Sequence, residues 1–144
     1  MRHTVADQLL DNGSVVSATQ AYTAWVDVHD LDAWSLLVAA TKVASGGDLT
    51  FTVQAAGESA AELNGTGPYI GNAVTPRATA QLSWTEALTA AATKVLSATN
   101  AGVLLSKIPQ DTLRSIRVGY KAATADATDK WTGVYIWLLG IGKE

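Results

Sequence analysis

Apolar and polar residues alternate along much of the chain, and this period of two is typical of half-buried β-strands. Residues 49–55 show it most clearly, because leucine, phenylalanine and valine alternate with threonine and glutamine. Residues 34–43 are more continuously apolar and predict a central strand. The sequence SGGD at 45–48 separates these two stretches, and its glycines can adopt the positive φ of a tight turn. The pattern therefore predicts that the two stretches form a hairpin.

The same alternation predicts further strands at 18–28, 78–84, 93–97, 103–108, 114–122 and 131–141. The last two of these are expected to form a final pair. Residues 58–77 are rich in Asn-Gly and Gly-Pro pairs, which predict a long surface loop with one helical turn at 59–63. About eight short strands with little helix indicate an all-β protein, either a two-sheet sandwich or a barrel.

The length of the chain predicts its domain organisation. A chain of 144 residues is the natural size of one domain and is long enough to bury a core without disulfides or metals. Residues 1–14 are interpreted as an N-terminal arm, in which Leu9 and Leu10 are available for packing. Residues 15–144 are then expected to form a single β-sandwich domain.

Composition and charge narrow the class of partners. The net charge of -3 is weak and mixed in sign, which argues against a nucleic-acid partner, because such proteins carry a clustered basic face. Only 16% of residues are charged, whereas about a quarter is usual, and this favours a surface that packs against other proteins. Without cysteine the chain has no disulfides or thiol chemistry. The N-terminus lacks a signal-peptide pattern and no apolar run is long enough for a membrane helix, so we expect cytosol-like conditions and no membrane.

Motifs that would carry catalysis or bind a metal are weak. Asp27, His29, Asp30 and Asp32 offer oxygen and imidazole ligands, but on a strand the first two point away from Asp30, which favours a solvated turn. Residues 65–71, GTGPYIG, lack the spacing of a phosphate-binding loop. No serine lies in a nucleophile-elbow sequence, and only two histidines could serve as a base. We therefore expect no catalytic residues, no metal ligands, no cofactor and no enzymatic activity.

Aromatic residues gather in the last predicted strand. Trp131, Tyr135 and Trp137 are expected to share one face, while the alternate positions of 134–138 are also apolar. A strand that is apolar on both faces implies either a central place in its sheet or a covering partner chain. A carbohydrate-stacking platform is the alternative interpretation, but such platforms usually have polar acceptors beside the rings.

Three stretches resemble the cement or decoration proteins of tailed-bacteriophage capsids, the group related to the Bordetella-phage cement protein. They are DQLLDNGSVVSATQAYTAWVDV (7–28), LLVAATKVASGGDLTFTVQAAGES (36–59) and RSIRVGYKAATADATDKWTGVYIWLL (114–139), which match the family's opening arm and strand, central pair and closing hairpin. The resemblance implies a jelly-roll-like antiparallel β-sandwich on the outside of the phage head, assembled in the host cytoplasm. It also implies that the protein clamps neighbouring major capsid proteins together.

The resemblance implies two kinds of partner, the major capsid protein and further copies of this chain in a homodimer or homotrimer. We expect contacts from the arm, from the 58–77 loop and from the last strand. The candidate interface residues are Leu9, Leu10, Tyr69, Ile70, Trp131, Tyr135 and Trp137. A carbohydrate- or host-surface-binding β-sandwich module of a phage virion is the alternative function.

Overall fold

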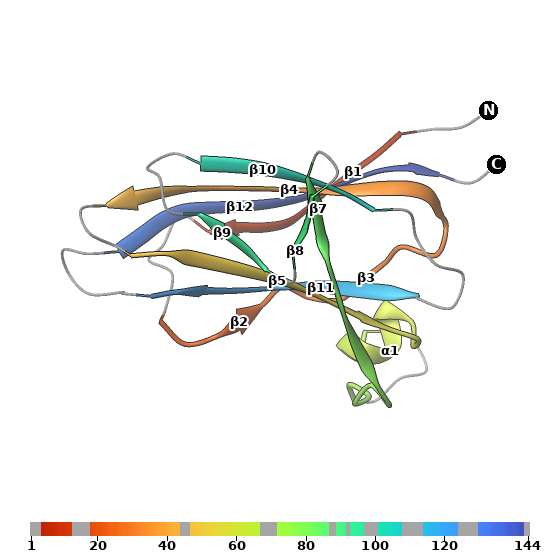
Figure 1. Cartoon of the computed structure of the whole chain (residues 1–144). Helices are drawn as coiled ribbons and strands as arrows, with labels where there is room; N and C mark the ends of the chain where they lie inside the picture. Colours follow the sequence, from red (N-terminus) through yellow and green to blue (C-terminus); the bar gives the residue numbers. More distant parts are fainter. Residues whose placement is uncertain are drawn as a thin grey trace.

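Two antiparallel β-sheets lie one above the other in the computed structural model (Figure 1). The structure describes residues 4–12, 18–43, 47–66, 72–86, 89–91, 93–96, 101–107, 114–123 and 130–142. In these ranges the chain forms twelve strands and one short helix, so the predicted all-β, jelly-roll-like sandwich is confirmed. The strands outnumber the predicted eight mainly because several have only two or three residues.

The first sheet, called sheet A, contains the longest strands. Its order is β1 (Thr4–Asn12), β12 (Lys130–Gly142), β4 (Leu31–Val43) and β10 (Ala101–Lys107), and neighbours are antiparallel. Strand β12 is therefore central, and β1 covers one of its edges. Most of the predicted arm thus forms an edge strand, whose first residue, Thr4, is paired with Ile141 near the end of β12 (Figure 1).

The second sheet, called sheet B, is built around two eight-residue strands, β11 (Ser115–Ala122) and β5 (Leu49–Ala56). Short strands continue it on either side, and a separate two-stranded ribbon completes the β-structure. The flanking strands are β2 (Ala21–Tyr22) and β3 (Val26–Asp27) beside β11, and β6 (Thr79–Leu82) and β9 (Lys94–Leu96) beside β5. The ribbon consists of β7 (Trp84–Glu86) and β8 (Thr89–Ala91).

The hydrophobic core lies between the two sheets. Alternate residues of β5 and β11, such as Phe51, Val53 and Val118, are fully buried, as the alternation predicts. Sheet A contributes the buried residues Trp34, Leu36, Val38, Ala40, Trp131, Val134, Ile136 and Leu138. Each large apolar side chain buried here contributes roughly 1.5–3 kcal/mol to folding. The indole N–H of Trp84 is satisfied by the carbonyl oxygen of Phe51 at 3.1 Å.

Both predicted hairpins are wrong. Strand β4 pairs with β12 and β10 in sheet A, whereas β5 pairs with β11, β6 and β9 in sheet B. Strands β11 and β12 likewise lie in different sheets. The reason is that each strand has one strongly apolar face, and two consecutive strands can bury those faces against each other by entering opposite sheets. Alternation defines the faces of a strand but not the strand beside it.

A short helix interrupts the loop after β5, which confirms the predicted helical turn. Helix α1 spans Ala60–Asn64, and the Ser59 hydroxyl caps it by accepting from the backbone N–H of Glu62 at 3.2 Å. The helix ends at Gly65, whose φ of 68° is left-handed, and a Cβ there would lie 2.7 Å from the backbone nitrogen of Ala73. In the described part of the chain, no helix has the length and apolar character needed to cross a membrane.

Candidate interaction surface

A β-bulge at Gly133 divides strand β12 into two parts. Gly133 has φ of 57°, and the pairing with β4 shifts register between Thr132 and Tyr135. The extra residue reverses which side chains face the core. Trp131 therefore faces inward, while Tyr135 and Trp137 face outward, and the prediction that the three aromatics share one face is wrong.

Trp131 belongs to the core. Its side chain is fully buried, and its indole nitrogen donates to the carbonyl oxygen of Gly47 at 3.1 Å. The ammonium group of Lys42 lies 5.9 Å from the ring centroid, a cation–π contact. The residue therefore joins β12 to the segment before β5 and offers no surface to a partner.

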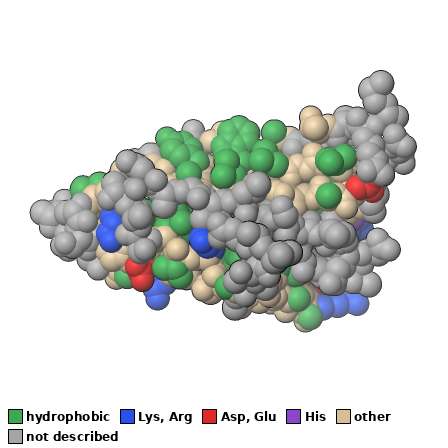
Figure 2. Space-filling model, turned by 45° about the horizontal axis from the view of Figure 1, so that its top comes forward, with side chains coloured by type: hydrophobic (Ala, Val, Ile, Leu, Met, Phe, Trp, Pro, Cys, Tyr) green, Lys and Arg blue, Asp and Glu red, His purple; other side chains and the backbone are tan. Residues whose placement is uncertain are grey.

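Tyr135 and Trp137 belong to an apolar surface on the outside of sheet A. On β12 they continue into Leu139 and Ile141, and on the neighbouring β4 they lie beside Leu37 and Ala39. Tyr135, Leu37 and Ile141 are 41, 37 and 39% exposed, and Trp137 and Leu139 are half-buried. Figure 2 shows hydrophobic side chains gathered on this upper side of the molecule.

The outside of sheet B is more polar. Its strands present Thr50, Thr52 and Gln54 from β5 and Arg117 from β11. The Arg117 Nε donates to the Gln54 side-chain oxygen at 2.8 Å, and its guanidinium lies 3.8 Å from the ring centroid of Tyr22. The same face also exposes two apolar side chains, Tyr22 and Val95, so it mixes polar and apolar residues.

The remaining candidate interface residues lie elsewhere. Leu9 and Leu10 are partly buried and pack against the core from the edge strand β1. A register shift between Gln8 and Leu10 lets both leucines reach that apolar environment. Tyr69 and Ile70 lie outside the residues that the structure describes.

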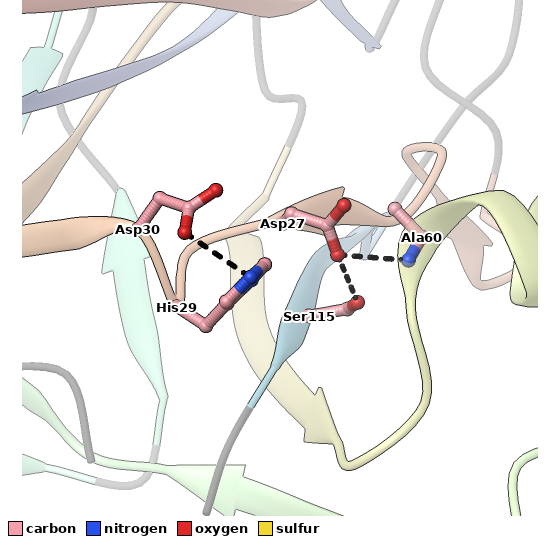
Figure 3. Close-up of polar contacts among 5 residues, drawn as sticks. All are labelled: Asp27, His29, Asp30, Ala60 and Ser115. Atoms are coloured by element: carbon pink, nitrogen blue, oxygen red, sulfur yellow. Dashed lines mark hydrogen bonds and ion pairs between the residues drawn. The ribbon is translucent and has the colours of Figure 1, made fainter. Parts of the chain in front are cut away.

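The acidic segment that begins at Asp27, the last residue of β3, forms a polar junction (Figure 3). One carboxylate oxygen of Asp27 accepts from the backbone N–H of Ala60 at 2.9 Å and from the Ser115 hydroxyl at 3.1 Å. The Asp27 carboxylate thus joins β3, β11 and the first turn of α1. His29 and Asp30 form the turn into β4, with His29 Nε2 3.2 Å from an Asp30 carboxylate oxygen. Across the described ranges, no three His, Cys, Asp or Glu side chains are placed to hold a metal ion.

A shallow depression of about 510 Å³ lies between the start of α1 and the segment before β6. Glu58, Glu62, Val74, Thr75 and Arg77 line it. A Glu58 carboxylate oxygen accepts from the backbone N–H of Arg77 at 2.9 Å, and this hydrogen bond lowers the pKa of Glu58 below its ordinary value of 4.5. The contact ties residues 58 and 77 together across the loop.

Comparison with solved structures gives matches over nearly the whole chain. A chain in the structure of infectious bursal disease virus, Gt strain, aligns with a TM-score of 0.50 at 11% identity and covers 96% of this chain. The corresponding match in the Gx strain has a TM-score of 0.49, 13% identity and 98% coverage. A third match, to the crystal structure of PBCV-1 VP54 fitted into a reconstruction of the virophage Sputnik, has a TM-score of 0.38, 9% identity and 100% coverage, with 43% of that chain matched.

The chain spans only 31 and 32% of the length of the Gt- and Gx-strain chains. No family model matches the chain, and no curated protein matches it either. At 11% identity, the likeness to the Gt-strain chain is one of fold alone, the antiparallel β-sandwich described above.

Proposed function

We propose that this chain is a structural protein of a bacteriophage virion that binds the outside of the head and strengthens contacts between major capsid proteins. The observation that carries the proposal is the β-sandwich fold, shared over 96% of the chain with a chain in the structure of infectious bursal disease virus. The sequence resemblance to phage cement proteins supports the finer role, a clamp on the capsid exterior.

The proposed role is mechanical, with no enzymatic activity, cofactor, nucleic acid or membrane. A protein that binds the assembled shell but not its separated subunits stabilises the shell by mass action, by about 2.7 kcal/mol per site at a free concentration one hundred times the Kd. Copies that are joined to one another bind with avidity, because the second contact becomes intramolecular. The low charged fraction of 16% suits a surface largely covered by neighbouring proteins.

The test is binding of the purified chain to expanded phage heads that lack it. We expect saturable binding at a fixed copy number per head, measured by co-sedimentation and by light scattering. Unlabelled chain should displace labelled chain, and decorated heads should release their DNA or lose their shape at a higher temperature than bare heads. Binding that never saturates, or that leaves the melting temperature of the heads unchanged, would refute the proposal.

A further inference from the structure

The outside of sheet A has the composition of a buried surface. We define its apolar face as Tyr135, Trp137, Leu139 and Ile141 of β12 with Ala33, Ser35, Leu37 and Ala39 of β4. The face contains three of the six large hydrophobic side chains that are exposed among the described residues. None of its eight residues is charged, and the acidic Asp11, which is paired with Tyr135 on the edge strand β1, lies at the border of the face; the outside of sheet B carries Arg117 and Lys121. Sheet A therefore presents the more continuously apolar of the two outer faces, and such a patch is suited to a partner.

The register between the two strands gives the apolar face a ridge and a furrow. Each large residue of β12 except Trp137 is paired with a small residue of β4. The pairs are Tyr135 with Ala39, Leu139 with Ser35, and Ile141 with Ala33. At the centre, Trp137 is paired with Leu37. The large side chains thus form a ridge along β12, beside a row along β4 that is small except at Leu37.

We propose that the apolar face binds a second copy of this chain through a twofold axis. The axis lies in the interface, above the boundary between β12 and β4, and runs parallel to both strands. Rotation about this axis keeps each residue's position along the strands and exchanges the two strands. The ridge of each copy then lies over the furrow of the other, with Tyr135 above Ala39 of the second copy. A twofold axis across the strands would instead stack ridge on ridge, so the pattern selects the first arrangement.

The available area is sufficient for a specific dimer. The outer side of sheet A has the apolar face at its centre and β1 and β10 at its edges; its four strands, spaced about 4.8 Å apart with about 3.4 Å per residue along the nine residues of β1, cover roughly 19 by 30 Å. Two such surfaces together bury on the order of 1,100 Å², just above the roughly 1,000 Å² expected of a biological interface. Two sheets that pack face to face generally stack about 10 Å apart. This inference does not depend on the proposed capsid function.

Self-association of the purified chain tests the inference without phage heads. In a dilution series followed by sedimentation velocity, we expect twice the mass of the chain at high concentration and the single-chain mass on dilution. Leu37→Lys places two like charges near the axis of a desolvated surface and should raise the dimer Kd about a hundredfold or more. Val95→Lys is the matched control, because Val95 is 42% exposed but lies on β9 in sheet B.

Three outcomes would overturn the inference. A wild-type chain that has the single-chain mass at every concentration forms no such dimer. A dimer that survives Leu37→Lys uses another surface, such as the open edge of β1. Equal weakening by Leu37→Lys and Val95→Lys would assign the effect to charge in general. Circular dichroism and melting curves of both variants establish that they fold before their masses are compared.

Cross-linking tests the orientation of the axis. The chain has no cysteine, so Ile141→Cys introduces a single thiol at one end of the apolar face. With the axis parallel to the strands, the two copies of position 141 lie on the order of 11 Å apart, whereas an axis across the strands through Trp137 separates them by more than about 25 Å. A short bis-maleimide should therefore join Ile141→Cys dimers and should not join Val95→Cys. No cross-link at position 141 in a chain that dimerises would overturn the proposed arrangement.

Discussion

The single residue with most effect on the last strand is Gly133, because the bulge there decides which aromatic side chains are buried. A Cβ at this position would meet the Tyr135 ring at 3.7 Å and the Thr41 hydroxyl oxygen at 4.0 Å, both ordinary contacts, so space does not exclude a larger residue. The left-handed backbone disfavours other residues, because a φ of 57° is costly for residues with a Cβ. We expect Gly133→Ala to lower the free energy of unfolding by about 1 kcal/mol, and Gly133→Asn to lower it less, in urea unfolding. Equal stability of all three proteins would contradict the bulge.

The two tryptophans of β12 provide a matched pair, because they lie in one strand but on opposite faces. Trp131→Ala removes a fully buried side chain and its hydrogen bond to Gly47, and should cost about 3–5 kcal/mol. Trp137→Ala removes a half-buried side chain on the outer face and should cost about 1 kcal/mol or less in the single-chain state. Denaturant unfolding of dilute protein measures both values. A larger cost for Trp137→Ala would place that residue, and not Trp131, in the core.

Glu58 gives the stability of the chain a predictable dependence on acid. Its pKa is lowered in the folded state, chiefly because its carboxylate accepts from the backbone N–H of Arg77. The stabilisation is therefore present at pH values above 4.5 and is lost as pH falls through the folded-state pKa. Glu58→Gln removes this contribution, so the variant should be less stable than wild type near neutral pH, and the two stabilities should converge as pH falls below the folded-state pKa. Identical acid limbs for wild type and variant would exclude this contribution.

At the scale of elements, the sequence predicted most strands but not their partners. Alternation located β5, β6, β9, β11 and β12 close to their observed bounds, because each strand has one face in the core. It could not choose between a hairpin and a crossing to the opposite sheet, since both bury the same face. The SGGD sequence favoured a hairpin, yet β4 and β5 lie in different sheets.

The aromatic residues of β12 also show what alternation alone could not predict. A strict period of two placed Trp131 beside Tyr135 and Trp137, and one extra residue at the bulge reversed that order. The glycine between them was the only sequence signal of the bulge. The contrast between the outer faces of sheets A and B could not be predicted from the sequence either, because it depends on which strands are neighbours. The polar junction at Asp27 depends on contacts with residues 60 and 115, far along the chain.

Deletion of strand β1 tests whether this segment is part of the folded domain or only an arm that contacts a partner. Residues 4–12 pair with β12, and Leu9 and Leu10 pack against the core. Deleting residues 1–12 removes this apolar contact and exposes the edge of the central strand β12 to solvent. We expect the free energy of unfolding to fall by about 2 kcal/mol or more, with a tendency to aggregate. An arm that served only to contact a partner would leave the unfolding curve of the isolated chain unchanged.

At the scale of the whole molecule, the asymmetry between the two outer faces predicts how self-association responds to solution conditions. The apolar face carries no charged side chain, so its burial releases few ions and gains little from Coulomb attraction. Dimerisation should therefore change little between low and high sodium chloride, since salt screens charges and leaves apolar contacts intact. It should strengthen in sulfate, which favours burial of apolar surface, and it should have a negative heat-capacity change. Sedimentation equilibrium in the two salts and dilution calorimetry at several temperatures measure these responses. A Kd that rises steeply with sodium chloride would mean that charged residues outside the apolar face hold the copies together.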